Sequence, residues 1–316
     1  MEAPDYRYTY GPVPSRRLGR SLGVDLVPFK TCTFDCIYCQ LGRTTNKTIQ
    51  RDEYVPVIKV IQEIEKRLNG NSHIDYITLA GSGEPTLHSN IGEIIKEIKY
   101  LTSIPVAVIT NGSLLSNSEV QDALMKADLI VPSLDAGSEN VFKLINRPHK
   151  NLQFNSMVDG ICEFRNRFRN NLWLEVFLVL NVNDTVPEVK NIASLVNKIS
   201  PDKVQLNTVF RPPAGENCRP LSSENLTAVK EYFEVDTEII TDFAFGKSQY
   251  LSDSAIRKKE ILTLLERRPC TAKNVADGLG IRVNEVVKQL DLLLEKEIET
   301  LRFGNDRLYY KRKRSQ

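Results

Sequence analysis

The sequence predicts an α/β protein: a partial (β/α)6 barrel of parallel strands followed by a small C-terminal domain. Short apolar runs alternate with amphipathic stretches along most of the chain. The apolar runs are nearly continuous, which is typical of parallel strands that helices cover on both faces or ring in a barrel. Six β-α units indicate a barrel that stays open, and a doubly wound open sheet is the structural alternative.

The expected elements follow from these two periodicities. Strands are predicted at residues 21–28, 75–81, 105–110, 129–136, 172–180 and 203–210. Between them, apolar residues recur at intervals of three and four, which predicts helices at 57–68, 90–101, 119–127 and 186–199.

The pattern changes near residue 250, so we expect one domain at 1–245 and a second at 246–316. The second contains predicted helices at about 254–266, 271–279 and 283–297, followed by the hairpin "IETLRF", "GND", "RLYYKR". Gly280 suits the position that ends the second helix. Three helices and a hairpin resemble a winged helix-turn-helix. Such modules bind nucleic acid in many proteins, through the third helix and the hairpin, and contact protein in others.

Charge is distributed unevenly over the two parts of the chain. Residues 254–316 hold 15 Lys+Arg and 9 Asp+Glu, a net charge of +6, whereas the whole chain carries only +2. A polyanionic partner and a solvated basic tail both account for this asymmetry.

Composition limits the class of protein. The chain has 316 residues, of which 41% are hydrophobic and 26% charged, as in globular proteins. No stretch approaches the roughly 18 apolar residues of a membrane span, so no membrane partner is expected. The first residues, "MEAPDYRYTY", do not resemble a secretory signal. We therefore expect a cytoplasmic protein, in which clustered cysteines bind metals or catalyse more often than they form disulfides.

Three of the six cysteines fall in "TCTFDCIYCQ", residues 31–40, with the spacing C-x3-C-x2-C. A structural zinc site needs four ligands, and the nearest histidine to Cys32, Cys36 and Cys39 is His73, so zinc would require a remote fourth ligand. A disulfide would leave one thiol over. Three thiolates do suit a [4Fe-4S] cluster with one open iron.

With Tyr38 just before its last cysteine, this motif resembles the hallmark of radical S-adenosylmethionine (radical SAM) enzymes. Further elements match in the same order: "GSGEPTL" (81–87), "ITNG" (109–112) and "PSLDA" (132–136). The resemblance covers roughly residues 11–215. The stretch 11–42 is close to a subgroup of iron-sulfur oxidoreductases grouped with the tRNA wyosine-base synthases. Residues 1–31 lack the additional cysteines of those synthases.

The resemblance implies a TIM-like barrel, a [4Fe-4S] cluster on the three cysteines, S-adenosylmethionine as cofactor, and an external electron donor of the flavodoxin or ferredoxin type. It also implies three sets of cofactor contacts. Gly83 and Glu84 would contact the methionine amino group, and Tyr38 would lie beside the adenine. The ribose or carboxylate would be contacted by Asn111, Ser133 and Asp135. Without the resemblance, "GSGEP" would be a tight loop and Asp135 a helix cap.

Weaker candidates lie near the same strand ends. Polar residues there are Gln205, Asn207 and Arg211, and Arg147 lies in "INRPHK". An arginine at this edge could hold the cofactor carboxylate or a substrate phosphate, or form a structural ion pair.

Two further features of the sequence leave their roles open. Cys218, in the loop after the sixth strand, could donate a hydrogen atom or be incidental. Arg16, Arg17 and Arg20 could steer an acidic substrate or pair with surface carboxylates.

Three hypotheses of function follow. The first is a radical SAM enzyme that cleaves its cofactor to a 5′-deoxyadenosyl radical and abstracts hydrogen from a macromolecule such as tRNA or another RNA. The second keeps this chemistry and gives it a protein or peptide substrate. The third is a nucleic-acid-binding redox sensor, which would have no need of the cofactor-binding elements.

Overall fold

A curved, mostly parallel sheet forms the main body of the computed structural model, which describes residues 7–70, 73–215, 217–240, 258–294, 296–304 and 306–313. Its strand order is β1-β2-β5-β6-β7-β8-β9-β10, with β1 antiparallel to β2 and the other pairs parallel. The bounds are β1 Thr9–Ser15, β2 Gly19–Val24, β5 Tyr76–Leu79, β6 Val106–Thr110, β7 Leu129–Pro132, β8 Asn171–Leu178, β9 Lys203–Thr208 and β10 Thr237–Ile239. The predicted α/β class and partial barrel are confirmed.

The sheet has two more strands than the sequence predicted. β2 and β5 to β9 are the six expected strands, and β1 and β10 are the strands at the two edges. β1 contains Pro12 and Pro14, which cannot donate ladder hydrogen bonds and are tolerated on an edge, and β10 has only three residues. Neither therefore shows the apolar run of a central strand. The strand expected at 129–136 ends at Pro132, beyond which Ser133 forms only an isolated bridge with Glu175.

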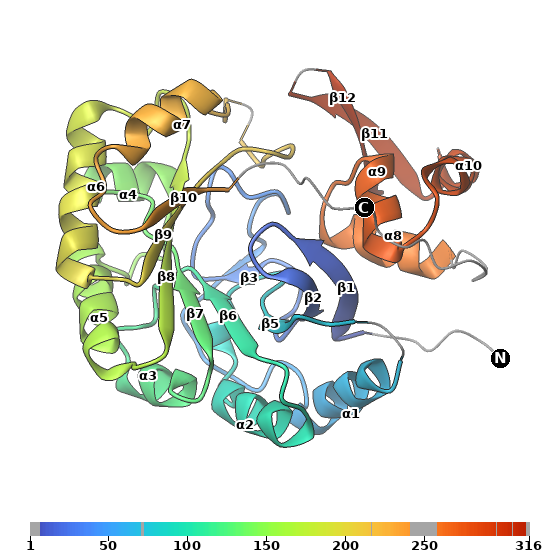
Figure 1. The fold of residues 1–316 in the computed structure, drawn as a ribbon, viewed down its shortest axis with the longest axis horizontal. Helices are drawn as coiled ribbons and strands as arrows, with labels where there is room; N and C mark the ends of the chain where they lie inside the picture. The colour runs from blue at the N-terminus through green and yellow to red at the C-terminus, as the bar shows by residue number, and fades with distance from the viewer. Residues whose placement is uncertain are drawn as a thin grey trace.

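Helices cover the outer face of the curved sheet (Figure 1). Four match the predicted helices: α1 Val57–Leu68, α2 Ile91–Leu101, α3 Ser118–Leu124 and α6 Val186–Ile199. Three more, α4 Glu139–Ile145, α5 Phe154–Arg167 and α7 Ser223–Lys230, were not predicted. α5 includes Gly160, a poor helix former, at a point where a Cβ would lie 2.4 Å from the backbone nitrogen of Ser116. Among the described residues, no helix is long and apolar enough to cross a membrane.

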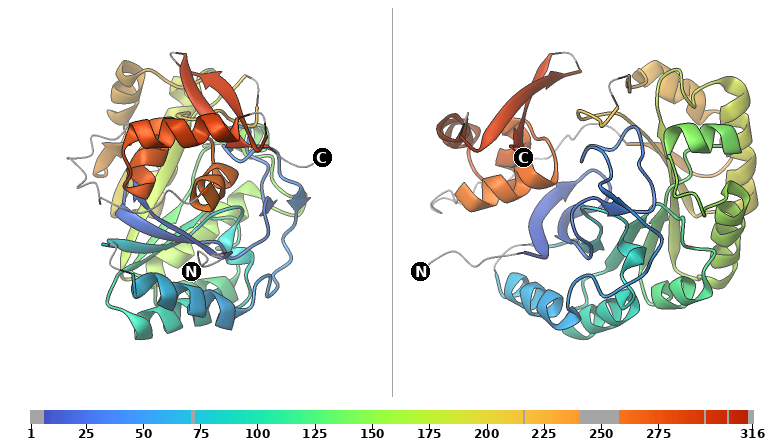
Figure 2. Two further views of the ribbon diagram at one scale, coloured as in Figure 1. Left: turned by 90° about the vertical axis from the view of Figure 1, so that its right-hand side faces the viewer. Right: turned by 180° about the vertical axis from the view of Figure 1, so that it is seen from behind.

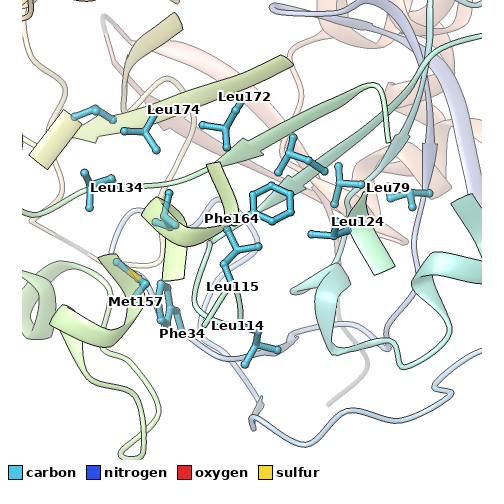
Figure 3. Packing of buried hydrophobic residues seen from close by; sticks show 14 of the residues in the cluster. Phe34, Leu79, Leu114, Leu115, Leu124, Leu134, Met157, Phe164, Leu172 and Leu174 are labelled. Atoms are coloured by element: carbon cyan, nitrogen blue, oxygen red, sulfur yellow. The ribbon is translucent and has the colours of Figure 1, made fainter. Parts of the chain in front are cut away.

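The largest hydrophobic cluster lies between these helices and the sheet (Figure 3). Leu79, Leu172 and Leu174 from the strands pack there with Phe164 of α5, and all four are fully buried. Burial of each such side chain stabilises the fold by about 1.5–3 kcal/mol. The strands that carry the polar residues at their ends are therefore held in place by the hydrophobic core.

The C-terminal unit has the predicted order of three helices and a hairpin. It consists of α8 Lys258–Arg267, α9 Ala272–Leu279, α10 Val283–Leu293, β11 Ile298–Phe303 and β12 Arg307–Arg312. Gly280 ends α9 in the left-handed region, with φ of +68°. The third helix ends four residues earlier than expected, because Leu294 is already extended, with ψ of 146°. Residues 254–257 of the first predicted helix and the boundary at 245/246 lie outside the described residues. The division at that boundary and the winged-helix identity stay predictions.

The C-terminal unit packs on edge strand β1 (Figures 1 and 2). Val13 of β1 belongs to the unit's own hydrophobic cluster, with Ile261, Val286 and Leu290. The Arg267 guanidinium forms an ion pair of 2.5 Å with Asp25, just past the end of β2. These contacts fix the unit beside the edge of the barrel at which the strands end.

Candidate functional site

The cysteine loop lies at the carboxyl ends of the parallel strands, where β2 leads into residues 25–45. Its first part, β3 (Thr31–Cys32), pairs in parallel with β4 (Asn46–Lys47), and the backbone N–H of Cys39 donates to the Cys36 carbonyl at 3.2 Å. All three cysteines are partly exposed. Cys32 is thus presented from β3, and Cys36 and Cys39 from the turn that follows it.

Each cysteine sulfur accepts a hydrogen bond from a side-chain nitrogen. The Asn111 amide lies 3.6 Å from Cys32 Sγ, and the Asn146 amide lies 3.4 Å from Cys36 Sγ. Lys30 Nζ lies 3.1 Å from Cys39 Sγ. The three donors come from different segments of the chain.

The number of potential ligands near the cysteine loop is relevant to which metal it could bind. Among the described residues, no three His, Cys, Asp or Glu side chains lie close enough to share one metal ion. The cysteine loop itself offers three thiols, one fewer than the four ligands of a structural zinc site.

Desolvation opposes ionisation of Cys32 and Cys36 in the absence of metal. Desolvation, with the Glu84 carboxylate next in size, raises the pKa of Cys32 to about 12. Desolvation and then Asp135 raise the pKa of Cys36 well above its ordinary value. A bound metal is thus what would hold Cys32 and Cys36 as thiolates.

The "GSGEP" loop after β5 packs directly on the cysteine loop. A Cβ on Gly83 would lie 1.8 Å from the Thr31 carbonyl oxygen, and the Glu84 N–H donates to that same oxygen at 3.1 Å. Only glycine allows this approach of the two backbones. Gly83 therefore has a structural role beside any cofactor contact.

Glu84 is buried with a fixed carboxylate. Its Oε1 accepts from the Thr86 hydroxyl and the Thr110 hydroxyl at 2.6 Å each, and from the Thr86 N–H at 3.1 Å. Its Oε2 accepts from the Asn111 N–H at 2.8 Å. Desolvation raises the pKa of Glu84 although these hydrogen bonds oppose the rise. The carboxylate is thereby held beside Cys32.

Asp135 organises the opposite side of the cysteine loop. It accepts from the Tyr38 hydroxyl at 2.5 Å, from the Asn146 amide at 2.7 Å and from the Phe177 N–H at 3.0 Å. Burial raises the pKa of Asp135 to about 6, against the effect of the Tyr38 and Asn146 hydrogen bonds. The Tyr38 ring stacks on Phe177 at 3.9 Å between centroids. This stack provides a flat apolar wall.

A second polar network centres on Glu175 of β8. Its carboxylate pairs with Arg17 and accepts from the Asn207 amide at 2.7 Å, and the Ser133 hydroxyl lies 3.5 Å away. Burial alone would raise the pKa of Glu175, but the Arg17 charge and these hydrogen bonds outweigh it and lower the pKa. Arg16 donates to Asn207 at 3.2 Å. The carboxylate is thus ionised and paired.

These groups line a cavity of about 270 Å3, named here the reaction cavity. Of the predicted site residues, it brings together Tyr38, Cys39, Asn207 and Arg211, along with Arg16 and Arg17. Arg211 also donates to Gln40 of the cysteine loop at 3.2 Å. Asn111 and Asp135 stand beside the cysteines instead, through the hydrogen bonds above.

Three weaker candidates lie away from this cavity. Gln205 donates to Glu238 of β10 at 2.5 Å. Arg147 lies 4.0 Å from Asp35, the structural ion pair that the sequence left open. Cys218 is buried in the hydrophobic core under the turn at Gly215.

The sequence did not identify Lys30, Asn146, Glu175 or Phe177. Glu175 did carry a signal, since it is the one charged residue in the apolar run "LWLEVFLVL". Lys30 and Asn146 carried no signal in the sequence, because they come close to the sulfurs only when the chain folds.

A family model described as "Radical SAM superfamily" matches residues 26–194. The chain therefore belongs to the radical SAM superfamily, whose members are enzymes that use a [4Fe-4S] cluster and S-adenosylmethionine. More narrowly, it is 34% identical over 305 residues to a UPF0026 protein of Helicobacter pylori, covering 95% of this chain and 96% of that protein. At that identity and coverage the chain is a member of the UPF0026 family.

A longer relative is the GTPase Obg of Brachyspira hyodysenteriae, 43% identical over 297 residues. The match covers 92% of this chain and 42% of that protein, so the chain spans less than half of that relative. Its name is therefore not transferred to this chain.

Solved structures resemble the fold at low sequence identity. A radical SAM methyltransferase of Sphaerobacter thermophilus aligns with a TM-score of 0.52 and 15% identity, over 69% of this chain and 65% of its own. SuiB of Streptococcus suis bound to S-adenosylmethionine aligns with a TM-score of 0.52 and 12% identity, over 69% and 50%. At these identities the likeness shows the fold alone.

Proposed function

We propose that this protein holds a [4Fe-4S] cluster on Cys32, Cys36 and Cys39 and uses it for radical chemistry on an RNA. The observation that carries the cluster assignment is the set of three sulfurs on one loop, each with its own nitrogen donor. When bound and reduced by an external flavodoxin or ferredoxin-type donor, the cluster supplies one electron that splits S-adenosylmethionine into methionine and a 5′-deoxyadenosyl radical.

The surrounding residues would bind and orient that cofactor. Glu84 carries a fixed negative charge beside Cys32 and suits the methionine ammonium, with Gly83 keeping the loop close. Asn111, Ser133 and Asp135 supply polar groups for the ribose or carboxylate. The stack of Tyr38 on Phe177 suits the adenine.

Charge in the reaction cavity supports an anionic substrate. Arg16, Arg17 and Arg211 line it together with a single carboxylate, Glu175. Guanidinium groups bind phosphate through paired hydrogen bonds, which favours RNA over an average protein surface. A peptide substrate is the second candidate, and the experiment below separates the two.

The test is cofactor cleavage by the anaerobically reconstituted and reduced protein, measured as 5′-deoxyadenosine with and without bulk tRNA. We expect product from the intact chain, none from Cys36→Ala, and more product when RNA is present. Failure to form product in the intact, iron-loaded protein would overturn the enzyme assignment. Stimulation by peptides and not by RNA would move the proposal to the second substrate class.

Lys30 provides a test of the cluster that does not depend on activity. It is buried, lies in the left-handed region with φ of +58°, and donates to Cys39. Replacing Lys30 with Met removes a positive charge that stabilises the more negative, reduced cluster. We expect the midpoint potential to fall by roughly 60 mV, a tenfold change for one electron.

A redox titration followed by electron paramagnetic resonance measures this shift. Lys30→Arg should retain most of the potential. Lys47→Met is the matched control, because it removes an exposed lysine whose Nζ donates to the Arg147 and Pro148 carbonyls. An unchanged potential in Lys30→Met would contradict the role of Lys30.

A further inference from the structure

Three cavities adjoin one another along the edge where the barrel strands end. The largest, about 800 Å3, lies between the cysteine loop and the C-terminal unit, and is named the hairpin cavity. A second of about 330 Å3, the helix cavity, is lined by α9, the hairpin and the segment after β9. The hairpin cavity shares Gln40 and Leu41 with the reaction cavity, and the helix cavity shares Arg16, Phe210 and Arg211 with it. Both therefore adjoin the reaction cavity.

We propose that these three cavities form one cationic track that binds a single-stranded segment of RNA and delivers one nucleotide to the cysteine loop. Helix α10, the element that would enter a nucleic-acid groove in a winged helix-turn-helix, lies outside this track. The inference rests on the proposed RNA substrate and names the surface that binds it.

The first argument is charge. Nine Lys and Arg side chains and four Asp and Glu side chains line the three cavities, a net charge of +5 in a chain whose total is +2. Three of the four acids already pair with cations of the lining: Glu175 with Arg17, Glu266 with Arg312, and Glu299 with Lys311. The excess of positive charge on the molecule is thus concentrated along this edge.

The second argument is the presence of aromatic surfaces among these cations. The Arg16 guanidinium lies 4.3 Å from the centre of the Phe210 ring, and Tyr309 lines the same helix cavity. Phe29 lines the hairpin cavity. Cations together with flat rings bind phosphates and stack bases without a duplex, whereas an acidic peptide would use only the cations.

The third argument is the charge of α10. Its exposed side chains are Asn284, Glu285, Lys288, Asp291 and Leu292, with a net charge of −1. None of them lines the three cavities. In Figure 1 this helix lies on the side of the C-terminal unit that is remote from the barrel. A helix that enters a groove of nucleic acid needs an excess of cations for the phosphates, whereas the exposed side chains of α10 carry a net negative charge.

The experiment compares two charge-reversal variants of the full-length, reconstituted protein. The track variant is Arg268→Glu with Lys273→Glu, which change the hairpin and helix cavities. The matched control is Lys288→Glu with Lys296→Glu, which change net charge by the same amount at exposed positions outside the track. Binding of a fluorescein-labelled single-stranded RNA of about 15 nucleotides is measured at several salt concentrations.

We expect the track variant to bind about tenfold or more weakly at low salt, with a salt slope smaller by about 1.4 if two phosphate contacts are lost. The control should stay within about twofold of the unchanged protein. Equal weakening in both variants, or greater weakening in the control, would overturn the track.

Two further outcomes separate this inference from the proposed function. Tighter binding of a poly-glutamate peptide than of the RNA would overturn the track and favour a protein substrate. RNA binding that depends on the track in a protein that forms no 5′-deoxyadenosine would support the track and overturn the radical chemistry. Circular dichroism melting of each variant checks that the fold is intact.

Discussion

Cys36→Ala is expected to lose nearly all bound iron. Cys36 stands in the middle of the cysteine loop, and its sulfur accepts the Asn146 amide, which Asp135 also holds. With two thiolates left, the loop can no longer hold three corners of a cubane, so the cluster should not survive gel filtration. Iron and acid-labile sulfide per chain, together with the visible absorbance of the cluster, measure this loss.

The matched control is Cys162→Ala. Cys162 lies in α5 and packs at the edge of the hydrophobic core, away from the cysteine loop. This variant should bind iron like the unchanged protein. Full iron and sulfide in Cys36→Ala would contradict the ligand assignment, and stoichiometric zinc in the intact protein purified without oxygen would favour the mononuclear alternative.

Glu84→Gln is expected to weaken S-adenosylmethionine binding and to destabilise the fold. Four donors converge on the Glu84 carboxylate, and Oε2 takes the backbone N–H of Asn111. An amide has one acceptor oxygen, so its NH2 group would face at least one of these donors. An unsatisfied buried group of this kind costs about 1–3 kcal/mol. Loss of the charge that would face the cofactor ammonium should raise the dissociation constant about tenfold or more.

Two measurements separate these effects. Urea unfolding of the metal-free protein reports the cost to the fold, and equilibrium dialysis of S-adenosylmethionine with the reconstituted protein reports the cost to binding. Glu93→Gln, at an exposed position in the first turn of α2, is the matched control and should change neither. Unchanged cofactor affinity in a well-folded Glu84→Gln variant would remove Glu84 from the proposed binding site.

The sequence determined the fold class because burial on both faces of a parallel strand is a local property of that strand. The runs that form β2 and β5 to β9 each read as strands, and α1 and α6 have the predicted bounds. The two edge strands were not predicted, because β1 carries two prolines and β10 is very short. An edge strand is defined by what lies beside it, and that information is not in its own residues.

For the site, the sequence identified the residues whose spacing along the chain is enough to indicate their function. Three cysteines within eight residues, and polar motifs at successive strand ends, required no long-range contact to be recognised. The predictions for the weaker candidates at the same strand ends were less accurate. Gln205 donates a hydrogen bond to Glu238 of β10, and Arg147 pairs with Asp35, because the direction of a side chain depends on its packing neighbours.

What only the tertiary structure decided is the set of contacts between distant segments. Asn146 reaches Cys36 across 110 positions of sequence, and Arg267 of the C-terminal unit reaches Asp25 across 242. Hydrogen bonds and ion pairs of this kind form where the fold brings two backbones together, so no periodicity or motif encodes them. The sequence by itself determined the cysteine loop and the strands that carry it. The nitrogen donors of the three sulfurs and the cationic edge were decided by how those strands and the C-terminal unit pack.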